Sequence, residues 1–381
     1  MKESGLIEES WDEIADIINA EIRGDDDWYD VSVYRKRYRD FKRAYENVFS
    51  KTYGDEYCQD LDEKKEELFK AKQKLYDQRR EYNKLLRSDA RSEHLIDEMI
   101  KVANELNRTC PLINISSDIN NSNKEAVLLL SDWHYGMVTD NIWNKYNTDI
   151  CRRRVSDLIY YTREYLSLNK IDRLHIVMLG DAAHGAIHTT ARIKAEEDTC
   201  DQIMNVAEII AETINSFTDV VNEVKVYSCY GNHMRSVQNK KDSIDSDNME
   251  KLIPWWLKQR LASNDKVEII DSEYKEFTKL NIFGYNICCV HGNFDNIKEI
   301  GVLANTIFTK KYGETIDYTI SGDKHHLEEF EKLGIENILI RSLCGTDDYA
   351  NGHRLYSKAG QTLLIFNEDY GREATYHIPL E

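Results

Sequence analysis

Features of exported and membrane proteins are missing from this 381-residue sequence. No apolar run approaches the length that spans a bilayer, and Met1 to Trp11 are acidic and lack the apolar core of a secretion signal. Internal repeats and low-complexity tracts are absent too. The eight cysteines show no C-x-x-C spacing, so we expect reduced, mostly buried thiols and no disulfide framework. These absences predict a cytoplasmic protein with no membrane contact.

Positive charge is scarce. Lys and Arg number 50 against 68 Asp and Glu, which gives a net charge of −18. Affinity for a phosphate backbone comes mainly from Lys and Arg, so the sequence argues against broad, nonspecific coating of nucleic acid. Local basic clusters remain, for example Arg35-Lys36-Arg37 and Arg152-Arg153-Arg154, although each is also compatible with an ordinary solvated face.

The first part of the chain, residues 1–55, has the pattern of a small helical module. Trp11, Ile14 and Ile18 share one helical face after Ser10, which is a suitable N-terminal cap. A second segment from Ser32 carries aromatic residues on one side and Arg and Lys around the other. Two short helices of which the second is basic resemble a helix-turn-helix that binds DNA, but any small helical bundle would show the same stripe.

Residues 56–107 read as long, highly charged helices. Apolar residues at heptad spacing make the first of them a candidate coiled coil: Leu61, Leu68, Leu75 and Tyr82. Such a coiled coil would join two subunits through residues 61–106, and the alternative is a long helix that lies on the catalytic domain. A second helix is expected through Leu95, Met99, Val102 and Leu106. Residues 108–125, which are rich in Asn and Ser, are expected to link this region to a domain over residues 126–381.

Five polar motifs in that last domain each follow a short apolar run that reads as a buried strand. The motifs are Asp132-Trp133-His134, Gly180-Asp181, Gly231-Asn232-His233, His291-Gly292 and Gly322-Asp323-Lys324-His325. Helical patterns lie between the runs, as in the apolar stripe from Ile203 to Ile214. An αβ alternation of this kind brings the carboxyl ends of the strands to one crevice. We therefore expect the motif side chains to converge.

Carboxylate, imidazole and amide side chains in this number suit a pair of divalent ions. Two such ions about 3.5–4 Å apart can supply a hydroxide for in-line attack, clamp a phosphate ester and offset its charge. A single buried His or Asp is usually no more than a hydrogen-bonded core residue. Five motifs in order, each at a strand end, favour a metal-dependent phosphoesterase.

The motifs resemble the pattern of the calcineurin-like metallophosphoesterase family, which is DxH, GDxx, GNH, H and GHxH in that order, over residues 126 to about 345. The resemblance implies an α/β fold, a sandwich of two β-sheets flanked by helices, here preceded by an all-α region. It implies a first metal held by Asp132, His134, Asp181 and His325. Asp181 would bridge to a second metal held by Asn232, His291 and Asp323. His233 would stabilise the transition state or protonate the leaving oxygen.

His184, three residues after Asp181, is similar to a histidine of the double-strand-break repair nuclease branch of this family, where it orients the scissile phosphate. This likeness favours a phosphodiesterase, namely a DNA nuclease of the kind found in phage or prophage genes and their bacterial hosts. The alternatives are a phosphomonoesterase of the same fold and a noncatalytic DNA-binding scaffold with a degenerate metal site. His188, Arg192 and Arg235 are candidates for binding substrate.

The sequence departs from the family pattern at two places. Asp323 replaces a histidine of GHxH, and a harder oxygen ligand favours Mn²⁺, with Mg²⁺ or Fe²⁺ as alternatives, over Zn²⁺. Asp323 could instead be no ligand, and His326 could compete with His325. Met234 stands where the family usually has an acid after GNH, so a carboxylate that would orient a ligand or His233 is expected to be missing.

Overall fold

The structure, a computed structural model, describes residues 9–23, 27–49, 55–112, 123–187, 194–237, 247–274 and 276–381. The chain divides into two compact units, Met1–Arg87 and Ser88–Glu381. The first is helical and the second contains both β-sheets. The predicted fold class, an α/β domain preceded by an all-α region, is confirmed. In the part of the chain that is described, no helix is both long and apolar enough to cross a membrane.

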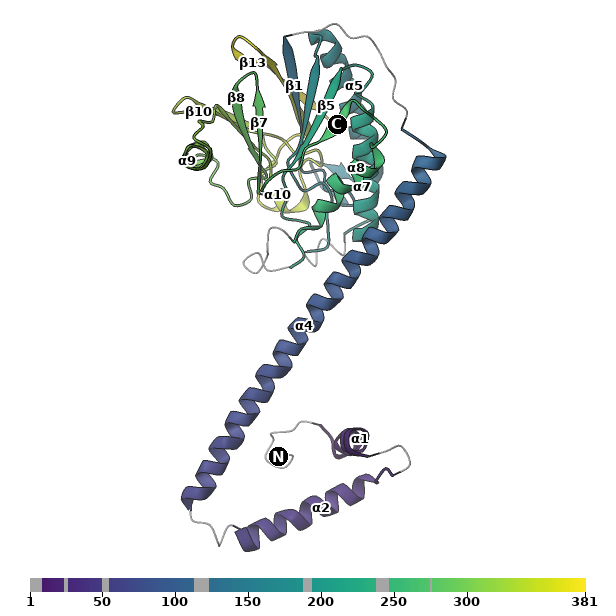
Figure 1. Cartoon of the computed structure of the whole chain (residues 1–381), viewed down its shortest axis with the longest axis vertical. Helices are drawn as coiled ribbons and strands as arrows, with labels where there is room; N and C mark the ends of the chain where they lie inside the picture. The colour runs from purple at the N-terminus through teal and green to yellow at the C-terminus, as the bar shows by residue number, and fades with distance from the viewer. Residues whose placement is uncertain are drawn as a thin grey trace. The chain divides into compact units, whose positions relative to one another are not determined.

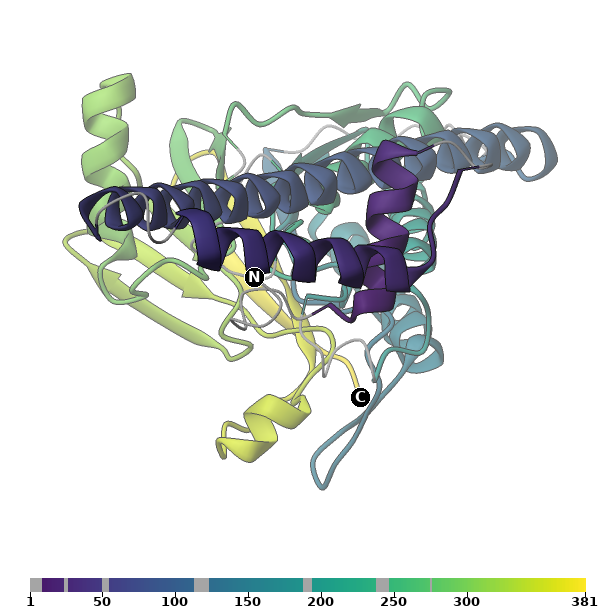
Figure 2. The ribbon, with the colours of Figure 1, turned by 90° about the horizontal axis from the view of Figure 1, so that it is seen from below.

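In the first unit, α1 (Trp11–Ile22) crosses α2 (Val31–Ala44), and the helix continues from α2 as a π-helical segment, Tyr45–Phe49 (Figures 1 and 2). Ser10 caps α1 in a reciprocal pair of hydrogen bonds with Glu13, as its position in the sequence predicts. The buried amide of Asn19 bonds the backbone of Tyr29 and accepts the hydroxyl of Tyr34 at 2.5 Å. The basic side chains of α2 remain at the surface, among them Arg35, Lys36, Arg39 and Arg43.

One continuous helix, α4 (Asp55–Thr109), occupies the region where the sequence predicts two. The expectation of a separate second helix is wrong because residues 55–109 contain neither Gly nor Pro, so nothing in the sequence interrupts the backbone hydrogen bonds. Leu68, Leu75 and Tyr82 are all more than half exposed. Near its end the helix buries Met99 and Ala103 in the core of the second unit.

The second unit holds two main sheets. The first has the strand order β13-β12-β1-β4-β5-β6. Its strands are β1 (Lys124–Leu130), β4 (Arg173–Met178), β5 (Glu223–Ser228), β6 (Val267–Ile269), β12 (Gly360–Asn367) and β13 (Gly371–Pro379). The second sheet has the order β10-β11-β9-β8-β7. Its strands are β7 (Phe277–Ile282), β8 (Tyr285–Val290), β9 (Tyr318–Ser321), β10 (Glu328–Lys332) and β11 (Ile335–Leu339).

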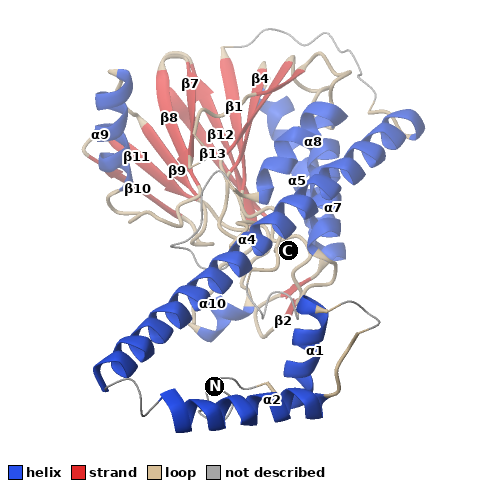
Figure 3. Ribbon diagram, turned by 60° about the horizontal axis from the view of Figure 1, so that its bottom comes forward, coloured by secondary structure: helices blue, strands red, loops and turns tan. Residues whose placement is uncertain are grey.

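Helices cover the outer faces of both sheets (Figures 1 and 3). They are α5 (Thr148–Asn169), α7 (Thr199–Asn215) and α8 (Leu252–Arg260) on the first sheet and α9 (Ile300–Tyr312) on the second. The shorter elements are β2 (Thr139–Asp140), β3 (Lys145–Tyr146), a 3₁₀ turn η3 (Met249–Lys251) and α10 (Asp348–Gly352).

The alternation of side chains along β1 shows how the layers are built. Leu128 and Leu130 belong to the core that the first sheet shares with α5, α7 and α8. Val127 and Leu129 point the other way, into the core between the two sheets. A third core joins the outer face of the second sheet to Phe308 of α9. The result is a helix–sheet–sheet–helix sandwich, as predicted.

Strand direction brings the motifs together. In the first sheet β1, β4 and β5 are mutually parallel, and in the second β8, β9 and β11 are parallel. The five apolar runs that the sequence predicts as strands correspond to β1, β4, β5, β8 and β9, and each motif begins within three residues of a strand end. All five motifs therefore leave the carboxyl edges of parallel strands, where the sheets leave a crevice for side chains.

Candidate metal centre

Backbone contacts draw the motif loops together. The N–H of Asp132 donates to the carbonyl of Gly180 at 3.1 Å, and the N–H of His134 donates to the carbonyl of Asp181 at 3.0 Å. Gly180 has a φ of +92°, and a Cβ there would lie 2.4 Å from the nitrogen of Gly231. A Cβ on Gly231 would lie 2.1 Å from Oδ1 of Asp181. The glycines of these two motifs are thus needed for the loops to approach one another.

Five of the candidate metal ligands have a left-handed backbone, which non-glycine residues adopt rarely. They are Asp132 (φ 53°), His134 (φ 45°), Asp181 (φ 54°), Asp323 (φ 58°) and His325 (φ 59°). Such conformations cost roughly 1–3 kcal/mol each and persist where the surroundings enforce them, most often at functional sites. The concentration of strain here, at residues that the motifs single out, makes this crevice the candidate functional site.

The two oxygens of the Asp132 carboxylate have different surroundings. Its Oδ2 accepts from the hydroxyl of Ser131 at 2.5 Å and from the N–H of Asp323 at 3.0 Å. Its buried Oδ1 accepts no hydrogen bond from any described residue and lies 3.2 Å from Nε2 of His325 and 3.8 Å from Nε2 of His134. One oxygen holds the loop, and the other is presented to the crevice.

The two carboxylate oxygens of Asp181 also have different surroundings. Its Oδ1 accepts from the N–H of His233 at 2.8 Å. Its Oδ2 lies 3.9 Å from Nε2 of His134, 3.2 Å from Nε2 of His291 and 3.9 Å from Nε2 of His233. This single oxygen therefore faces imidazoles from both sheets. It occupies the position that a ligand shared by two metal ions would need.

The remaining ligands fall into two groups on either side of Asp181. His134 and His325, whose Nε2 atoms are 3.3 Å apart, lie with Asp132 in the first group. In the second group, Nε2 of His291 lies 3.5 Å from Oδ1 of Asp323. The Oδ1 of Asn232 and the Nε2 of His291 are buried and form no hydrogen bond within the described part of the chain. Buried polar atoms without such partners are rare, and a coordinated cation would satisfy these two.

Ionisation equilibria show that the crevice favours positive charge. Burial disfavours an imidazolium at His291, but the carboxylates of Asp181, Asp132 and Asp323 outweigh it and raise its pKa to about 10. Burial also opposes ionisation of Asp132, yet His325 and His291 lower the pKa of that carboxyl to about 2. Both shifts favour positive charge in the crevice, which divalent ions would supply when bound.

The pKa of His134 shifts in the opposite direction to that of His291. Burial, and after it the nearby His233, lowers the pKa of His134 well below its usual value. A neutral imidazole is the form that binds a metal ion. His291 is held by a hydrogen bond from Nδ1 to the carbonyl of Leu179 at 2.7 Å, which directs Nε2 toward Asp181 and Asp323. The ring of His291 is therefore held in an orientation suited to coordination.

The two predicted catalytic histidines lie beside this centre. Nδ1 of His233 donates to the carbonyl of His184 at 2.9 Å, so Nε2 is the nitrogen that faces Asp181. The rings of His184 and His233 are 5.7 Å apart, and that of His184 is 5.9 Å from His134. The side chain of His233 is more exposed than those of the carboxylates, at 22%. A phosphate on the crevice could thus reach both rings.

The structure places Asp323 and His325, but not His326, among the candidate ligands. Asp323 points one oxygen at His291 and accepts Lys324 with the other, so it lies among the candidate ligands. His325 also lies there, whereas His326 is exposed, with Nδ1 3.0 Å from the carbonyl of Lys324. The spacing argument for His325 over His326 agrees with this placement.

The candidate substrate residues remain predictions. His188 and Arg192 lie outside the described residues. Arg235 is 9% exposed and donates to the carbonyls of Asn232 at 2.8 Å and Val237 at 3.1 Å. These bonds make Arg235 a support of the loop that carries Asn232 and His233.

A buried carboxylate that the sequence did not single out supports two of the motif loops. Glu250, in η3, is 3% exposed and accepts from the N–H of Ala182 at 2.8 Å and the N–H of Gly231 at 2.5 Å. It therefore ties the loop of Asp181 to the loop of Asn232. Burial, and after it the charge of Asp181, raises the pKa of Glu250 to about 7. Glu250 lies 19 residues beyond Gly231 and holds the two loops through their backbone. The expectation from Met234, that a carboxylate orienting a ligand side chain or His233 is missing, therefore stays a prediction.

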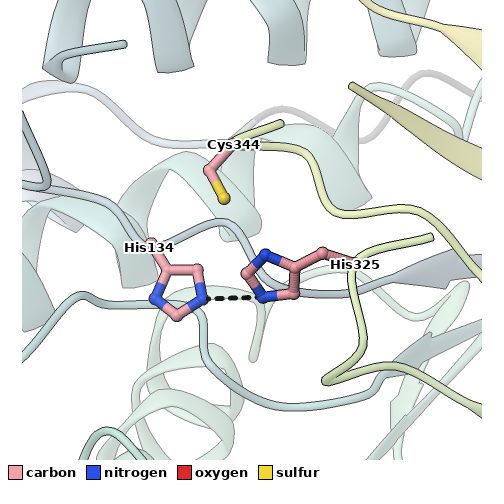
Figure 4. Close-up of side chains that lie close together, drawn as sticks. All are labelled: His134, His325 and Cys344. Carbon is pink, nitrogen blue, oxygen red and sulfur yellow. Dashed lines mark hydrogen bonds between the residues drawn. The ribbon is translucent and has the colours of Figure 1, made fainter. Parts of the chain in front are cut away.

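Cys344, five residues after the end of β11 at Leu339, was also not singled out from the sequence as a candidate ligand. Its buried Sγ lies within 4.8 Å of ring nitrogens of His134 and His325 (Figure 4). In the figure the thiol points toward the two imidazoles. Sγ also approaches the carbonyl of Gly345 at 3.5 Å. The first group of ligands thus has a sulfur atom at its edge, a signal that strand-end position alone could have given.

Comparisons with known proteins give one full-length relative and several weak structural likenesses. No protein-family model matches the chain. The SPbeta prophage-derived uncharacterized protein YonJ of Bacillus subtilis (strain 168) is 23% identical over 383 residues, which cover 96% of this chain and 91% of the relative. A novel archaeal phosphodiesterase shares 14% identity at a TM-score of 0.34, covering 66% of this chain and 99% of its own. Vps29 of Entamoeba histolytica, solved with Zn²⁺, shares 13% at a TM-score of 0.30, covering 67% and 99%. Likenesses this weak do not indicate a substrate.

Replacing Glu250 by Gln tests its role in holding the two loops. Glutamine can accept one of the two backbone N–H groups but presents an amide N–H₂ to the other. Loss of a supporting partner of this kind typically weakens metal binding about 10–100-fold. We expect that loss for Mn²⁺ in isothermal titration calorimetry.

The matched control is Glu268→Gln, which makes the same chemical change on an exposed side chain of β6. It should bind Mn²⁺ as the unaltered protein does. Equal affinity in Glu250→Gln would show that this carboxylate does not position the ligands.

Proposed function

We propose that this chain is a two-metal-dependent phosphodiesterase and that its substrate is DNA, which it cuts as a nuclease. The observation that carries the proposal is the position of Asp181 Oδ2 between two groups of ligands, 3.9 Å from His134 and 3.2 Å from His291. A carboxylate oxygen shared in this way fits a pair of ions better than a single one. When bound, two divalent ions would supply the nucleophile and offset the charge of the phosphate.

The donor atoms support Mn²⁺, or Mg²⁺, for the second position. Its candidate ligands are oxygens of Asp181, Asn232 and Asp323 and one imidazole, that of His291. Oxygen-rich sets suit hard ions, whereas thiolate and imidazole suit Zn²⁺. The three carboxylates carry three negative charges against the four positive charges of two ions, so a bound phosphodiester would meet a site of net positive charge.

His233 and His184 act on the phosphate in different ways in this proposal. His233, held through Nδ1, presents Nε2 at the mouth of the crevice, where it can stabilise the phosphate in the transition state or give a proton to the leaving oxygen. His184, whose carbonyl fixes His233 and whose ring lies beside it, orients the phosphate. This pair supports a diester substrate, because a second esterified oxygen must be held as well as the one that leaves.

Substitution of Asp181 tests the shared ligand. Asp181→Asn keeps the shape but removes the charge, and we expect hydrolysis of bis-p-nitrophenyl phosphate and of DNA to fall at least ~100-fold, more than is usual for a merely supporting residue. His233→Ala should lower turnover by a factor of about 10²–10⁴ and still bind two ions per chain. Asp369→Asn, in an exposed turn between β12 and β13, is the control.

The assay compares Mn²⁺, Mg²⁺ and Zn²⁺ on single-stranded, duplex and circular DNA and on the diester and monoester chromogenic substrates. Faster hydrolysis of p-nitrophenyl phosphate than of the diester would replace the nuclease by a phosphomonoesterase. Fewer than two ions per chain with no turnover in Mn²⁺ would indicate a noncatalytic scaffold.

The basic surface of α2 contacts the DNA backbone in this proposal. Binding would then depend on Arg39 and Arg43, both exposed, and would weaken with salt as phosphate contacts do. Reversing both charges to Glu should weaken DNA binding and flatten its salt dependence in fluorescence anisotropy titrations. Reversing Lys72 and Arg79 on α4 changes the net charge equally and should leave the slope unchanged. An equal loss in both pairs would mean that only net charge matters.

The exposed heptad residues of α4 pair two copies of the chain in this proposal. Leu68, Leu75 and Tyr82 are 72%, 67% and 61% exposed, and burial against a second helix would remove this apolar surface from water. Sedimentation equilibrium should give a dimer for the full chain and a monomer for the Leu68→Asp/Leu75→Asp variant. A monomer in both cases would refute the pairing.

A further inference from the structure

A cavity of about 360 Å³ opens beside the second group of ligands. Gly231 and Asn232 line it on one side, and Gly292, the residue after His291, lines it on another. The cavity therefore adjoins the candidate metal centre and shares Asn232 with it. Its volume lies at the lower end of the ~300–1,000 Å³ typical of small-molecule sites.

The walls are mainly apolar and are formed by α9, β8 and the loop that carries Phe294. α9 contributes Ile300, Ala304, Ile307 and Phe308, and β8 contributes Cys288 and Val290. Phe294, which follows the His291 motif, stands at the edge with 63% of its surface exposed, and Ile307 is 54% exposed. Exposed aromatic and aliphatic side chains that gather around a concave site favour an apolar ligand group there.

Polar groups interrupt these walls. Six of the lining residues have amide or charged side chains: Asn232, Arg235, Asn248, Glu276, Asn293 and Asp295. Two of them are fixed from within, since Arg235 donates to the carbonyl of Asn232 and Asn248 donates to the carbonyl of Gly231 at 2.7 Å. The floor next to the metal centre is thus rigid. An alkyl chain would desolvate the carboxylates of Glu276 and Asp295 in these walls without offering them a donor, whereas the amino groups of a nucleobase edge could donate to them.

We infer that this cavity binds a nucleobase of the DNA substrate, that of the nucleotide adjoining the cleaved phosphodiester. The inference rests on the proposed function, because it takes the phosphate to lie at Asp181 and Asn232. The base stacks on Phe294 and packs against Ile307 and Ala304, as bases do on aromatic platforms in proteins that bind single strands. A strand must be unpaired at this point for its base to enter, so the cavity selects single-stranded DNA or frayed ends.

Nucleoside binding tests the cavity without any reaction. Adenosine, guanosine, cytidine and thymidine are titrated into the full chain in EDTA and followed by saturation-transfer difference NMR, so neither phosphate nor metal contributes. We expect binding of at least one nucleoside. Phe294→Ala and Ile307→Asp should each weaken it about tenfold or more, the first by removing the stacking partner and the second by placing a charge in the wall.

Thr306→Asp is the matched control, since it puts the same charge on the exposed side of α9 outside the cavity. It should bind nucleosides as the unaltered protein does, and thermal melting verifies that all three variants fold. In steady-state cleavage of single-stranded DNA, Phe294→Ala and Ile307→Asp should raise KM more than they lower kcat.

The outcomes separate this inference from the proposed function. Nucleoside binding without DNA cleavage keeps the base site and refutes the nuclease. DNA cleavage with no nucleoside binding and unchanged KM in both cavity variants refutes the base site and keeps the nuclease. Binding of octyl phosphate in place of every nucleoside would overturn the inference in favour of an acyl chain.

Discussion

The structure depends on the way in which two carboxylates are shared between the backbone and the crevice. Asp132 and Asp181 each use one oxygen to hold a neighbouring loop and present the other to a cluster of imidazoles. Three carboxylates in so small a space repel one another unless positive charge lies between them. Against the effect of burial, the carboxylates of Asp181, Asp132 and Asp323 raise the pKa of His291 to about 10, which is the direction expected where positive charge is favoured.

The fold holds these carboxylates close together despite their repulsion. The candidate ligands come from the ends of parallel strands in two different sheets, so the interior between the sheets holds them at fixed separation. Left-handed backbones at five ligands add strain, which the hydrogen bonds between motif loops and the clamp by Glu250 oppose. Bound divalent ions would relieve the charge repulsion without moving the loops. The hydrogen bonds that hold the motif loops and the candidate ligands thus lie at the same edge of the sandwich.

The sequence predicted the elements that carry the motifs because a buried strand and its polar end leave a local pattern. The runs before Asp132, Asp181, Asn232, His291 and Asp323 each became a strand, and the stripe from Ile203 to Ile214 became α7. Glu250 could not be found in this way, because its role depends on a distant backbone contact and not on its neighbours. Cys344 follows a sixth strand whose apolar run was not connected with the motifs.

Other features required the three-dimensional structure for different physical reasons. The continuity of α4 depends on the absence of helix breakers over 55 residues, and a change in apolar spacing concealed it. The cavity beside Asn232 is formed by α9, β8 and the loop of Phe294, which only the packing of the second sheet brings together. Local patterns specify strands and motifs, whereas the surfaces between them follow from tertiary packing.

The most direct test of the shared carboxylate is anomalous X-ray diffraction from crystals loaded with Mn²⁺. The account predicts two manganese peaks about 3.5–4 Å apart, one on each side of Oδ2 of Asp181. A single peak, or two peaks that do not share Asp181, would contradict it.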